Sequence, residues 1–331
     1  MKVLRIDRPY HVSLVDIELP HPQPDEILIK VMACGICGTD IHIFRGEYVD
    51  QYPVIPGHEF SGIIEQIGKG VTRFQVGDHV AVEPNISCDH CYYCLQNRQN
   101  FCQNWQAIGV TLPGSMAQYV IVPEKSVFIL GELPFEHGTF MEPLSCVLHG
   151  IEQINLSIGH RVAVLGAGPI GILFLQLVRL QGAVSVTVLE KHPYRAEMAK
   201  KYGADCVKRN VSDIKKDHFD VVIDATGAIP VMEQTIDLVC PGGTVLLFGV
   251  PPAGKKMSLE GFKIFRKGLT LLSSFTSVRN SFQALSLLQS KQIDVSDLIS
   301  YVLPLSEFGR GIELLEKGIE DVEKVLILPQ A

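Results

Sequence analysis

The pattern of hydrophobic and polar positions changes near residue 150 of this chain. In the first part, short apolar or alternating runs are separated by prolines and glycines, a pattern that is typical of strands joined by turns. These runs predict a mostly antiparallel β domain with irregular loops. The strands expected there are 12–17, 27–32, 80–82 and 119–122.

From residue 150 to about residue 280, buried-type strands alternate with apolar helical segments. This order predicts βαβ units and a parallel sheet. Beyond residue 280 the chain returns to amphipathic helices and one last strand. The expected strands are 161–165, 185–189, 219–225, 244–248 and 325–328, and the expected helices are 170–180, 194–202, 231–239, 281–289 and 307–317.

The composition is that of a globular α/β protein long enough for two cores. The chain has 331 residues, of which 47% are hydrophobic. Its 29 basic and 36 acidic residues give a net charge of −7, and without a basic tract this argues against nucleic acid as the main partner. No uncharged apolar run reaches the roughly 18 residues needed to span a bilayer. Charges within the first apolar run are unlike a signal peptide. We therefore expect a cytoplasmic protein without a membrane partner.

A glycine motif lies where the first βαβ unit begins. The pattern Gly-x-Gly-x-x-Gly at residues 166–171 stands between the expected strand 161–165 and the expected helix 170–180, which is the context that a dinucleotide fingerprint requires. Such glycines allow a tight turn, close approach to a pyrophosphate and close packing of helix on strand. Packing alone in an α/β core is the alternative. The expected cofactor-binding residues of this turn are Gly166, Gly168, Pro169, Ile170 and Gly171.

Glu190 ends the next expected strand, 19 residues after Gly171. A carboxylate at this position can accept hydrogen bonds from both ribose hydroxyls and repels a 2′-phosphate, so NAD is favoured over NADP. With Lys191 and His192 beside it, NADP is the alternative cofactor. Arg195 could stack on the adenine, or it could be an ordinary exposed helix arginine.

Four of the nine cysteines follow the spacing Cys88-x2-Cys91-x2-Cys94-x7-Cys102. Four thiolates saturate a tetrahedral zinc ion, so such a site is closed and structural. The opening spacing also suits an iron–sulfur cluster, but the last gap departs from the three-residue gap of bacterial ferredoxins. Residues 87–104 contain few aliphatic side chains that could form a core. We therefore expect a structural zinc ion to hold this lobe.

A second set of metal-type residues, Cys37, His58 and Glu59, lies upstream of the lobe. A Cys/His/carboxylate set leaves one position on zinc open for water or a substrate oxygen, as catalytic zinc sites do. A chain that carries both sets, followed by a dinucleotide motif, is expected to be a zinc-dependent dehydrogenase.

The longer motifs around these residues resemble a known family. Gly57-His58-Glu59-x2-Gly62-x5-Gly68-x2-Val71 resembles the zinc alcohol dehydrogenase signature of the medium-chain dehydrogenase/reductase superfamily. The run 37–42 resembles the first metal loop of that family, and the four-cysteine lobe its structural zinc site. The resemblance covers essentially the whole chain. It implies a GroES-like catalytic domain, residues 1–149 and 281–331, around a Rossmann domain, residues 150–280. It also implies two zinc ions per chain, NAD(P)-dependent interconversion of alcohol and ketone, and a homodimer or homotetramer.

The stretch Met-Glu-Pro-Leu-Ser at residues 141–145 resembles the polyol, sorbitol-like branch of the superfamily. In that branch a glutamate replaces the cysteine that classical alcohol dehydrogenases use as third zinc ligand. The resemblance assigns Cys37, His58 and Glu142 to the catalytic zinc, with Glu59 able to join or exchange. A carboxylate leaves zinc a stronger Lewis acid than a thiolate does. Glu142 could instead cap the following helix.

Three further residues near Cys37 have expected roles in the family. Thr39 would take the hydroxyl proton of the substrate, and His42 would carry it to solvent. Both could instead cap the turn that follows. Asp40 is a candidate to hold the imidazole ring of His58.

The substrate is the least specified part of the prediction. Sorbitol-like enzymes carry a Phe-Arg pair after the Rossmann core, where this chain has residues 273–277, and the missing arginine argues against sorbitol itself. A sugar alcohol, with or without phosphate, is the first choice. The alternatives are an enzyme like L-threonine 3-dehydrogenase, another secondary-alcohol dehydrogenase, and a non-enzymatic redox sensor that binds zinc and NAD. A quinone reductase of this fold would lack the zinc residues.

Overall fold

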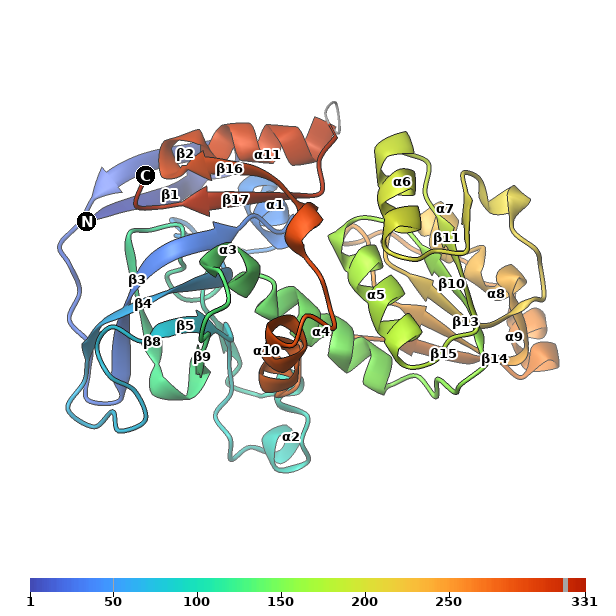
Figure 1. The fold of residues 1–331 in the computed structure, drawn as a ribbon, viewed down its shortest axis with the longest axis horizontal. Helices are drawn as coiled ribbons and strands as arrows, with labels where there is room; N and C mark the ends of the chain where they lie inside the picture. The colour runs from blue at the N-terminus through green and yellow to red at the C-terminus, as the bar shows by residue number, and fades with distance from the viewer. Residues whose placement is uncertain (50, 318–320) are drawn as a thin grey trace. The chain divides into compact units, whose positions relative to one another are not determined.

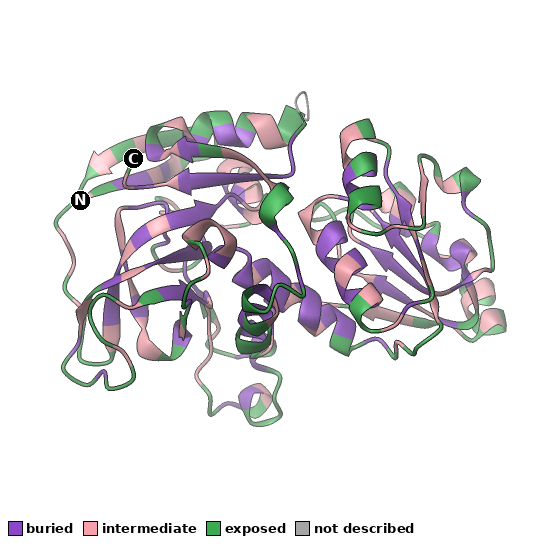
Figure 2. Ribbon diagram, viewed as in Figure 1, coloured by how far each residue is buried: buried purple, intermediate pink, exposed green. Residues whose placement is uncertain are grey.

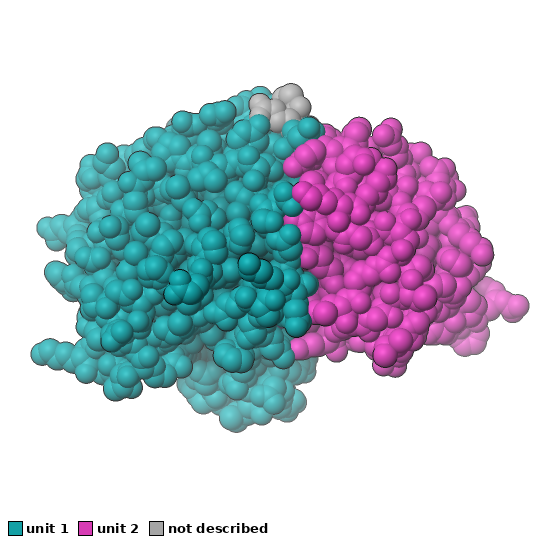
Figure 3. All heavy atoms as spheres, viewed as in Figure 1, with its two compact units in different colours: residues 1–145, 277–331 teal, residues 146–276 magenta. Residues whose placement is uncertain are grey.

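The computed structural model, which describes residues 1–49, 51–317 and 321–331, places both chain ends in one unit and the middle of the chain in another (Figure 3). Unit 1 comprises Met1–Ser145 and Ser277–Ala331, and unit 2 comprises Cys146–Thr276. Both boundaries lie four residues before those expected from the sequence. Each unit is built on its own buried sheet (Figure 2).

The sheet of unit 1 joins the beginning of the chain to its end. β3 (Glu26–Gly35) pairs with β4 (Glu59–Ile67), β8 (Tyr119–Pro123) and the last strand, β17 (Lys324–Leu328) (Figure 1). All these pairs are antiparallel, as the alternating pattern predicted. The sheet runs β16-β17-β3-β4-β5-β9. Its other strands are β5 (His79–Val82), β9 (Val127–Ile129) and β16 (Ile299–Pro304), which pairs with β17 in parallel.

Smaller elements of unit 1 surround this sheet. α11 (Phe308–Lys317) packs closely on it, because Gly311 leaves room for Ile36: a Cβ there would lie 2.5 Å from the Cδ1 atom of Ile36. The remaining elements are β1 (Lys2–Arg8), β2 (His11–Asp16), α1 (Gly38–Arg45), β6 (Asn85–Ile86), α2 (Tyr92–Leu95), β7 (Gln106–Ala107), α3 (Phe135–Gly138) and α10 (Ser281–Gln289). α4 (Met141–Glu152) carries the chain across the boundary into unit 2.

Unit 2 is a six-stranded, all-parallel sheet, as the alternation of strands and helices predicted. Its order is β12-β11-β10-β13-β14-β15. Along the chain, the strands that follow β10 (Arg161–Leu165) are first added on one side of it, as β11 and β12, and then on its other side, as β13, β14 and β15, so the strand order reverses at β10. In open sheets of this kind, ligands bind outside the carboxyl ends of the strands at such a reversal. The other elements are α5 (Pro169–Leu180), β11 (Ser185–Leu189), α6 (Pro193–Lys201), β12 (Cys206–Lys208), β13 (Phe219–Asp224), β14 (Val239–Leu247), α9 (Gly261–Lys267) and β15 (Thr270–Ser273).

The helical segment expected over 231–239 is interrupted and ends one residue earlier than predicted. Two short helices, α7 (Ile229–Met232) and α8 (Thr235–Leu238), occupy this stretch, and Val239 already begins β14. The β-branched Val239 favours a strand, and Pro241 disfavours helix for the residue before it. No helix of the described residues is both long and apolar enough to cross a membrane.

Candidate active site

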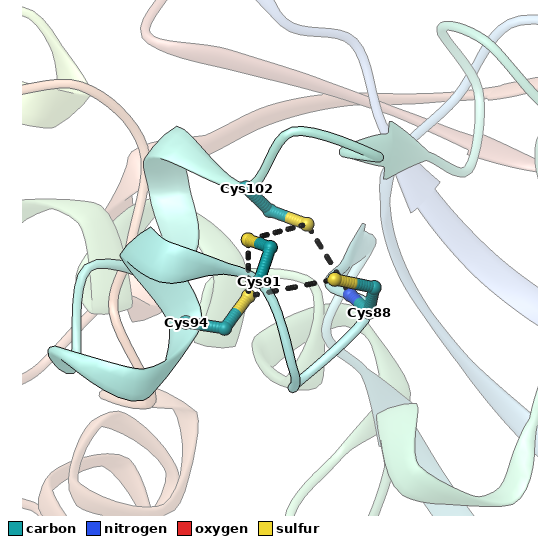
Figure 4. Close-up of side chains that lie close together, drawn as sticks. All are labelled: Cys88, Cys91, Cys94 and Cys102. Atoms are coloured by element: carbon teal, nitrogen blue, oxygen red, sulfur yellow. Dashed lines mark hydrogen bonds between the residues drawn. The ribbon is translucent and has the colours of Figure 1, made fainter.

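The four cysteine sulfurs of the lobe converge on one point (Figure 4). The Sγ atom of Cys91 lies 3.5 Å from that of Cys94 and 4.0 Å from that of Cys102, and the Sγ atoms of Cys88 and Cys94 are 4.0 Å apart. A zinc ion bound at about 2.3 Å by four thiolates holds the sulfurs roughly 3.8 Å apart. The arrangement therefore fits one tetrahedral ion, and it is too tight for a cluster of several iron atoms.

Backbone amides of the lobe point at these sulfurs. The N–H groups of Cys88 and Asn104 donate to the Sγ atom of Cys102 at 3.3 and 3.4 Å. Amides of Gln103 and Cys94 lower the pKa of the Cys91 thiol. Metal binding requires the thiolate form, which these amides favour at Cys91, whereas burial and the neighbouring cysteines raise the pKa of Cys94.

The second ligand set forms where β3 ends and β4 begins. The antiparallel register pairs Gly35 with Glu59, so the loop after β3 lies beside the loop before β4. One ligand atom each of Cys37, His58 and Glu59 consequently lies within 4.8 Å of the others. His58 and Glu59 are buried, while Cys37 is partly accessible. The sheet register thus assembles this group from two segments that the sequence separates.

Asp40 connects the loop that carries Cys37 to the loop that carries His58. Its buried carboxylate accepts hydrogen bonds from the N–H groups of Cys37 at 2.8 Å and Gly57 at 3.1 Å. One of its oxygens lies 3.6 Å from the Nδ1 atom of His58. Burial by itself lowers the pKa of His58, but the negative charges of Asp40 and Cys37 raise it well above the ordinary value. The Nδ1 atom has no hydrogen-bond partner among the described residues. A metal ion would compensate for this concentration of negative charge.

Lys324 is a member of this group that the sequence did not reveal. Its ammonium group donates to an Oε atom of Glu59, and both side chains are buried. Burial lowers the pKa of Lys324, but Glu59 and Cys37 outweigh it and raise the pKa above the usual value, so the amine is charged. The two partners are 265 positions apart, and no local motif marks the lysine.

Glu142 does not belong to the group of three close ligand residues among the described residues. It lies half-buried in the first turn of α4, where the hydroxyl of Ser145 donates to its carbonyl oxygen at 2.6 Å. Its assignment as a zinc ligand therefore stays a prediction.

The two residues expected to move the proton of the substrate hydroxyl, Thr39 and His42, both lie in α1. The Nδ1 atom of His42 lies 2.6 Å from an Oε atom of Glu47, which follows the left-handed Gly46 at the end of the helix. Donation of an Nδ1 proton to this carboxylate would leave the Nε2 atom of a neutral ring as an acceptor. Glu47 is a neighbour that the sequence analysis missed, although it stands only five residues after His42.

In unit 2, each of the three glycines of the turn at 166–171 is required for a different physical reason. Gly166 has a φ of 100°, which other residues rarely adopt. A Cβ on Gly171 would lie 2.0 Å from the carbonyl oxygen of Gly166, so helix and turn could not pack. A Cβ on Gly168 would meet only the Nη1 atom of Arg195, at 3.8 Å, so the backbone there is open to a ligand. Pro169 begins α5, where its missing N–H costs little.

Glu190 is fixed beside this turn at the end of β11. Its two carboxylate oxygens accept hydrogen bonds from the N–H groups of Ala167 at 3.0 Å and His192 at 2.8 Å. Among the described residues, three buried polar atoms near the carboxyl ends of β11 and β15 have no hydrogen-bond partner. They are His192 Nδ1, Ser274 Oγ and Thr276 Oγ1. An open glycine turn with unsatisfied polar atoms along the same edge of the sheet fits a dinucleotide.

Asp224 is a further residue of this edge that the sequence analysis missed. Its buried carboxylate accepts hydrogen bonds from the N–H groups of Thr226 and Gly227, both at 3.1 Å. The Cγ2 atom of Thr226 would lie 2.9 Å from a Cβ on Gly166. Asp224 thus holds the loop that closes one side of the glycine turn. In the sequence, its position as a carboxylate at the end of an otherwise apolar strand could have marked Asp224 as a functional residue.

Known proteins resemble both units. The family model described as alcohol dehydrogenase GroES-like domain matches residues 23–132, and that described as zinc-binding dehydrogenase matches residues 169–290. D-arabinitol dehydrogenase 1 of Uromyces fabae is 32% identical over 95% of this chain and 93% of its own. D-altritol 5-dehydrogenase of Agrobacterium fabrum is 34% identical over 89% of this chain and 90% of its own.

Among solved structures, a zinc-binding dehydrogenase of Sinorhizobium meliloti bound to NADP has a TM-score of 0.95 and 35% identity, with 99% of each chain covered. These similarities confirm the GroES-like and Rossmann fold that the motifs implied. The chain therefore belongs to the zinc-containing medium-chain dehydrogenase/reductase superfamily and is an oxidoreductase of the polyol dehydrogenase-like kind.

Proposed function

We propose that this protein is an NAD-linked dehydrogenase that interconverts a secondary hydroxyl group of a polyol, with or without phosphate, and the corresponding ketone. The close approach of Cys37 and His58, with the Glu59 carboxylate beside them, carries the proposal, because these two ligands together with one carboxylate leave a zinc ion one position for a substrate oxygen. The four-thiolate lobe, by contrast, would hold its zinc ion closed. We therefore infer two zinc ions per chain with unequal roles.

The residues around the open site have separate tasks. When bound there, zinc would supply a Lewis acid that lowers the pKa of a substrate hydroxyl, and the nicotinamide would accept the hydride. Asp40 fixes the loops that carry Cys37 and His58. Thr39 would take the proton of the hydroxyl group. His42, oriented by Glu47, would pass the proton to solvent through Nε2.

We assign Glu142 as the third permanent ligand and Glu59 as an exchanging one. The ion pair with Lys324 supports this division, because it already engages the Glu59 carboxylate. A glutamate from α4 would then complete the site without a second thiolate. The polyol dehydrogenase relatives support the substrate class.

The cofactor assignment depends on Glu190. Both of its oxygens are held by backbone amides, so the carboxylate cannot easily turn away from a ribose 2′-phosphate. This favours NAD. NADP is the second candidate, since the Sinorhizobium relative binds it and the Arg195 guanidinium reaches toward Gly168.

A substrate panel tests the proposed activity. D-arabinitol, D-altritol, a polyol phosphate, L-threonine and a simple secondary alcohol are each offered with NAD⁺, and formation of the reduced cofactor is followed by absorbance. We expect the highest kcat/KM for a polyol or polyol phosphate. Preference for threonine or the simple alcohol would contradict the substrate class. NAD⁺ binding without turnover of any alcohol would favour the redox sensor.

His58→Ala is the matched variant for this panel. It should abolish turnover and leave NAD⁺ binding, measured by calorimetry, nearly unchanged, because His58 lies in unit 1 and the glycine turn in unit 2. Equal loss of both would mean that His58 is structural. We also infer a homodimer or homotetramer, which light scattering of the purified protein tests.

A further inference from the structure

A polar cavity lies in unit 1 where the cysteine lobe joins the rest of the unit. Its volume of about 380 Å³ is within the range of small-molecule pockets. Its walls come from stretches that are far apart in the chain, namely 83–89, 99–105, 125–128 and 277–281. The described residues that line it include no member of either metal-type set. The cavity is therefore not explained by the catalytic or the structural zinc site.

One wall of the cavity is fixed by hydrogen bonds to the carboxylate of Glu83. This carboxylate accepts from the hydroxyl groups of two buried serines, Ser277 at 2.9 Å and Ser281. It also accepts from the backbone and side-chain amides of Asn85, at 3.0 and 2.6 Å. The indole N–H of Trp105 donates to the side-chain oxygen of Asn85 at 3.2 Å. These bonds fill the acceptor capacity of Glu83 and join the end of β5, the lobe and the segment 277–281 into one wall.

Three charged side chains of the cavity remain accessible to a ligand. The ammonium group of Lys125 donates to one Oδ atom of Asp89 at 2.7 Å, and the Nη2 atom of Arg279 lies 3.7 Å from the other. The side chains of Lys125, Asp89 and Arg279 are 46%, 45% and 65% exposed. Lys125 also donates to the carbonyl oxygen of Ser87. Even so, the two cations have more N–H groups than these partners accept, and a carboxylate can accept further hydrogen bonds. The cavity thus offers a ligand both donors and acceptors.

Two of these charged residues have a left-handed backbone, with φ of 62° at Asp89 and 57° at Arg279. Aspartate adopts this conformation more readily than most residues, but for arginine it is uncommon. Such strain persists only where the surrounding structure imposes it, and it is found at ligand clamps. A binding role for the guanidinium group would explain why an arginine is kept at position 279.

The composition of the lining indicates the class of ligand. Its acidic side chains, Glu83 and Asp89, balance its basic ones, Lys125 and Arg279, so neither a simple anion nor a simple cation is favoured. A hydroxyl group both donates and accepts, so adjacent hydroxyl groups could bond to a carboxylate and a cation at the same time. Aromatic side chains of the lining offer apolar surface to a carbon chain. They are Trp105 and Phe128.

We propose that this cavity is a second, non-catalytic site for an uncharged polyhydroxylated molecule, a polyol or a sugar. The inference goes beyond the proposed function, because it requires neither the catalytic zinc ion nor the dinucleotide. A ligand in the cavity would bridge the cysteine lobe and the segment 277–281, where the chain returns from unit 2. It would therefore stabilise the attachment of the lobe to unit 1.

Saturation-transfer NMR with D-arabinitol tests the proposal, because this method detects weak binding through the signals of the ligand. The full-length, zinc-loaded protein is compared with His58→Ala, which lacks a ligand of the catalytic metal. We expect the D-arabinitol signal to persist in His58→Ala. D-altritol should displace D-arabinitol there, whereas inorganic phosphate should not.

Variants of the cavity show where the ligand binds. Arg279→Asn and Asp89→Asn each remove a charge and introduce a residue that tolerates a left-handed backbone. In the His58→Ala background, each should weaken D-arabinitol binding about tenfold or more, because a hydrogen bond to a charged group is lost. Lys291→Asn is the matched control, since Lys291 is exposed, has a φ of 56° and lies outside the cavity lining. It should bind D-arabinitol as its parent does. Zinc content and thermal unfolding show whether each variant is folded.

The possible outcomes separate this site from the catalytic one. Loss of the D-arabinitol signal in His58→Ala would mean that the catalytic site is the only one and would overturn the proposal. Unchanged binding in both cavity variants, or displacement of D-arabinitol by phosphate, would overturn it as well. A wild type that oxidises no alcohol, yet binds D-arabinitol in a manner that depends on Arg279 and Asp89, would contradict the proposed function and support the second site.

Discussion

Single carboxylates in both units act through the backbone that they hold. Asp40 joins the two metal loops by accepting one amide from each, and Glu190 joins the glycine turn to the end of β11 in the same manner. Asp224 holds the neighbouring loop. Because their oxygens are already engaged, these side chains have little freedom, and replacing them changes the position of their neighbours as well as the charge.

At the residue scale, Glu190→Ser tests whether Glu190 sets the preference for NAD⁺ over NADP⁺. The wild type should prefer NAD⁺ to NADP⁺ by at least about tenfold in kcat/KM, or about 1.4 kcal/mol, and the variant should narrow or reverse this ratio. Glu197→Ser, an exposed change on the adjacent helix α6, is the control and should keep the wild-type ratio. Equal use of both cofactors by the wild type would show that Arg195 dominates and would contradict the assignment of NAD.

At the scale of elements, the cysteine lobe depends on its metal ion. Its buried cluster consists of Cys91, Cys94 and Cys102, with Tyr93 and Trp105 packed against them, so it has no aliphatic core of its own. A closed thiolate site contributes folding energy directly. Loss of one ligand should therefore unfold the lobe rather than merely weaken it.

Cys91→Ser should reduce the zinc content from two ions to one per chain and lower thermal stability and solubility. Cys206→Ser, which replaces a half-buried thiol on β12 of unit 2, is the matched control and should keep both ions. Metal analysis and thermal unfolding check the two variants together. Two ions in Cys91→Ser, or iron in the wild type, would contradict the structural zinc site.

The start of α4 gives a second prediction at this scale. If Glu142 binds zinc, Glu142→Gln should lower zinc occupancy or turnover, whereas Glu142→Cys should still bind the metal. The softer thiolate would shift the activity–pH profile upward. If Glu142 only stabilises the helix start, Glu142→Gln should cost roughly 1 kcal/mol of stability and leave the chemistry unchanged. Normal kinetics and full zinc content in Glu142→Gln would thus remove it from the site.

At the scale of the whole molecule, two units with separate sheets should respond separately to their ligands. In differential scanning calorimetry, NAD⁺ at about 100 times its Kd should add about 2.7 kcal/mol to the free energy of unfolding of unit 2. Removing zinc with a chelator should lower only the transition of unit 1, which holds both ligand sets. A single transition that shifts with either ligand would show that the units unfold together.

Those features of the fold and the site that a short stretch of chain determines by itself could be predicted from the sequence. The four cysteines of the lobe and the three glycines of the turn each lie close together in the chain, so their spacing alone indicated their arrangement. Lys324 could not be found in this way, since only the pairing of β17 with β3 brings it near the ligands. The helix expected over 231–239 ends one residue early because Val239 pairs with Phe219 in the sheet, and this pairing of distant residues is not visible in the local sequence.

Trp105 is the only tryptophan of the chain; it directly follows the cysteine lobe and packs against the cysteine cluster. Its indole N–H donates to the side-chain oxygen of Asn85 at 3.2 Å, which fixes the ring beside the metal-type sulfurs. Intrinsic tryptophan fluorescence therefore arises from one defined place in the protein. Its intensity and wavelength would report, without any attached dye, whether the lobe has kept or lost its ion.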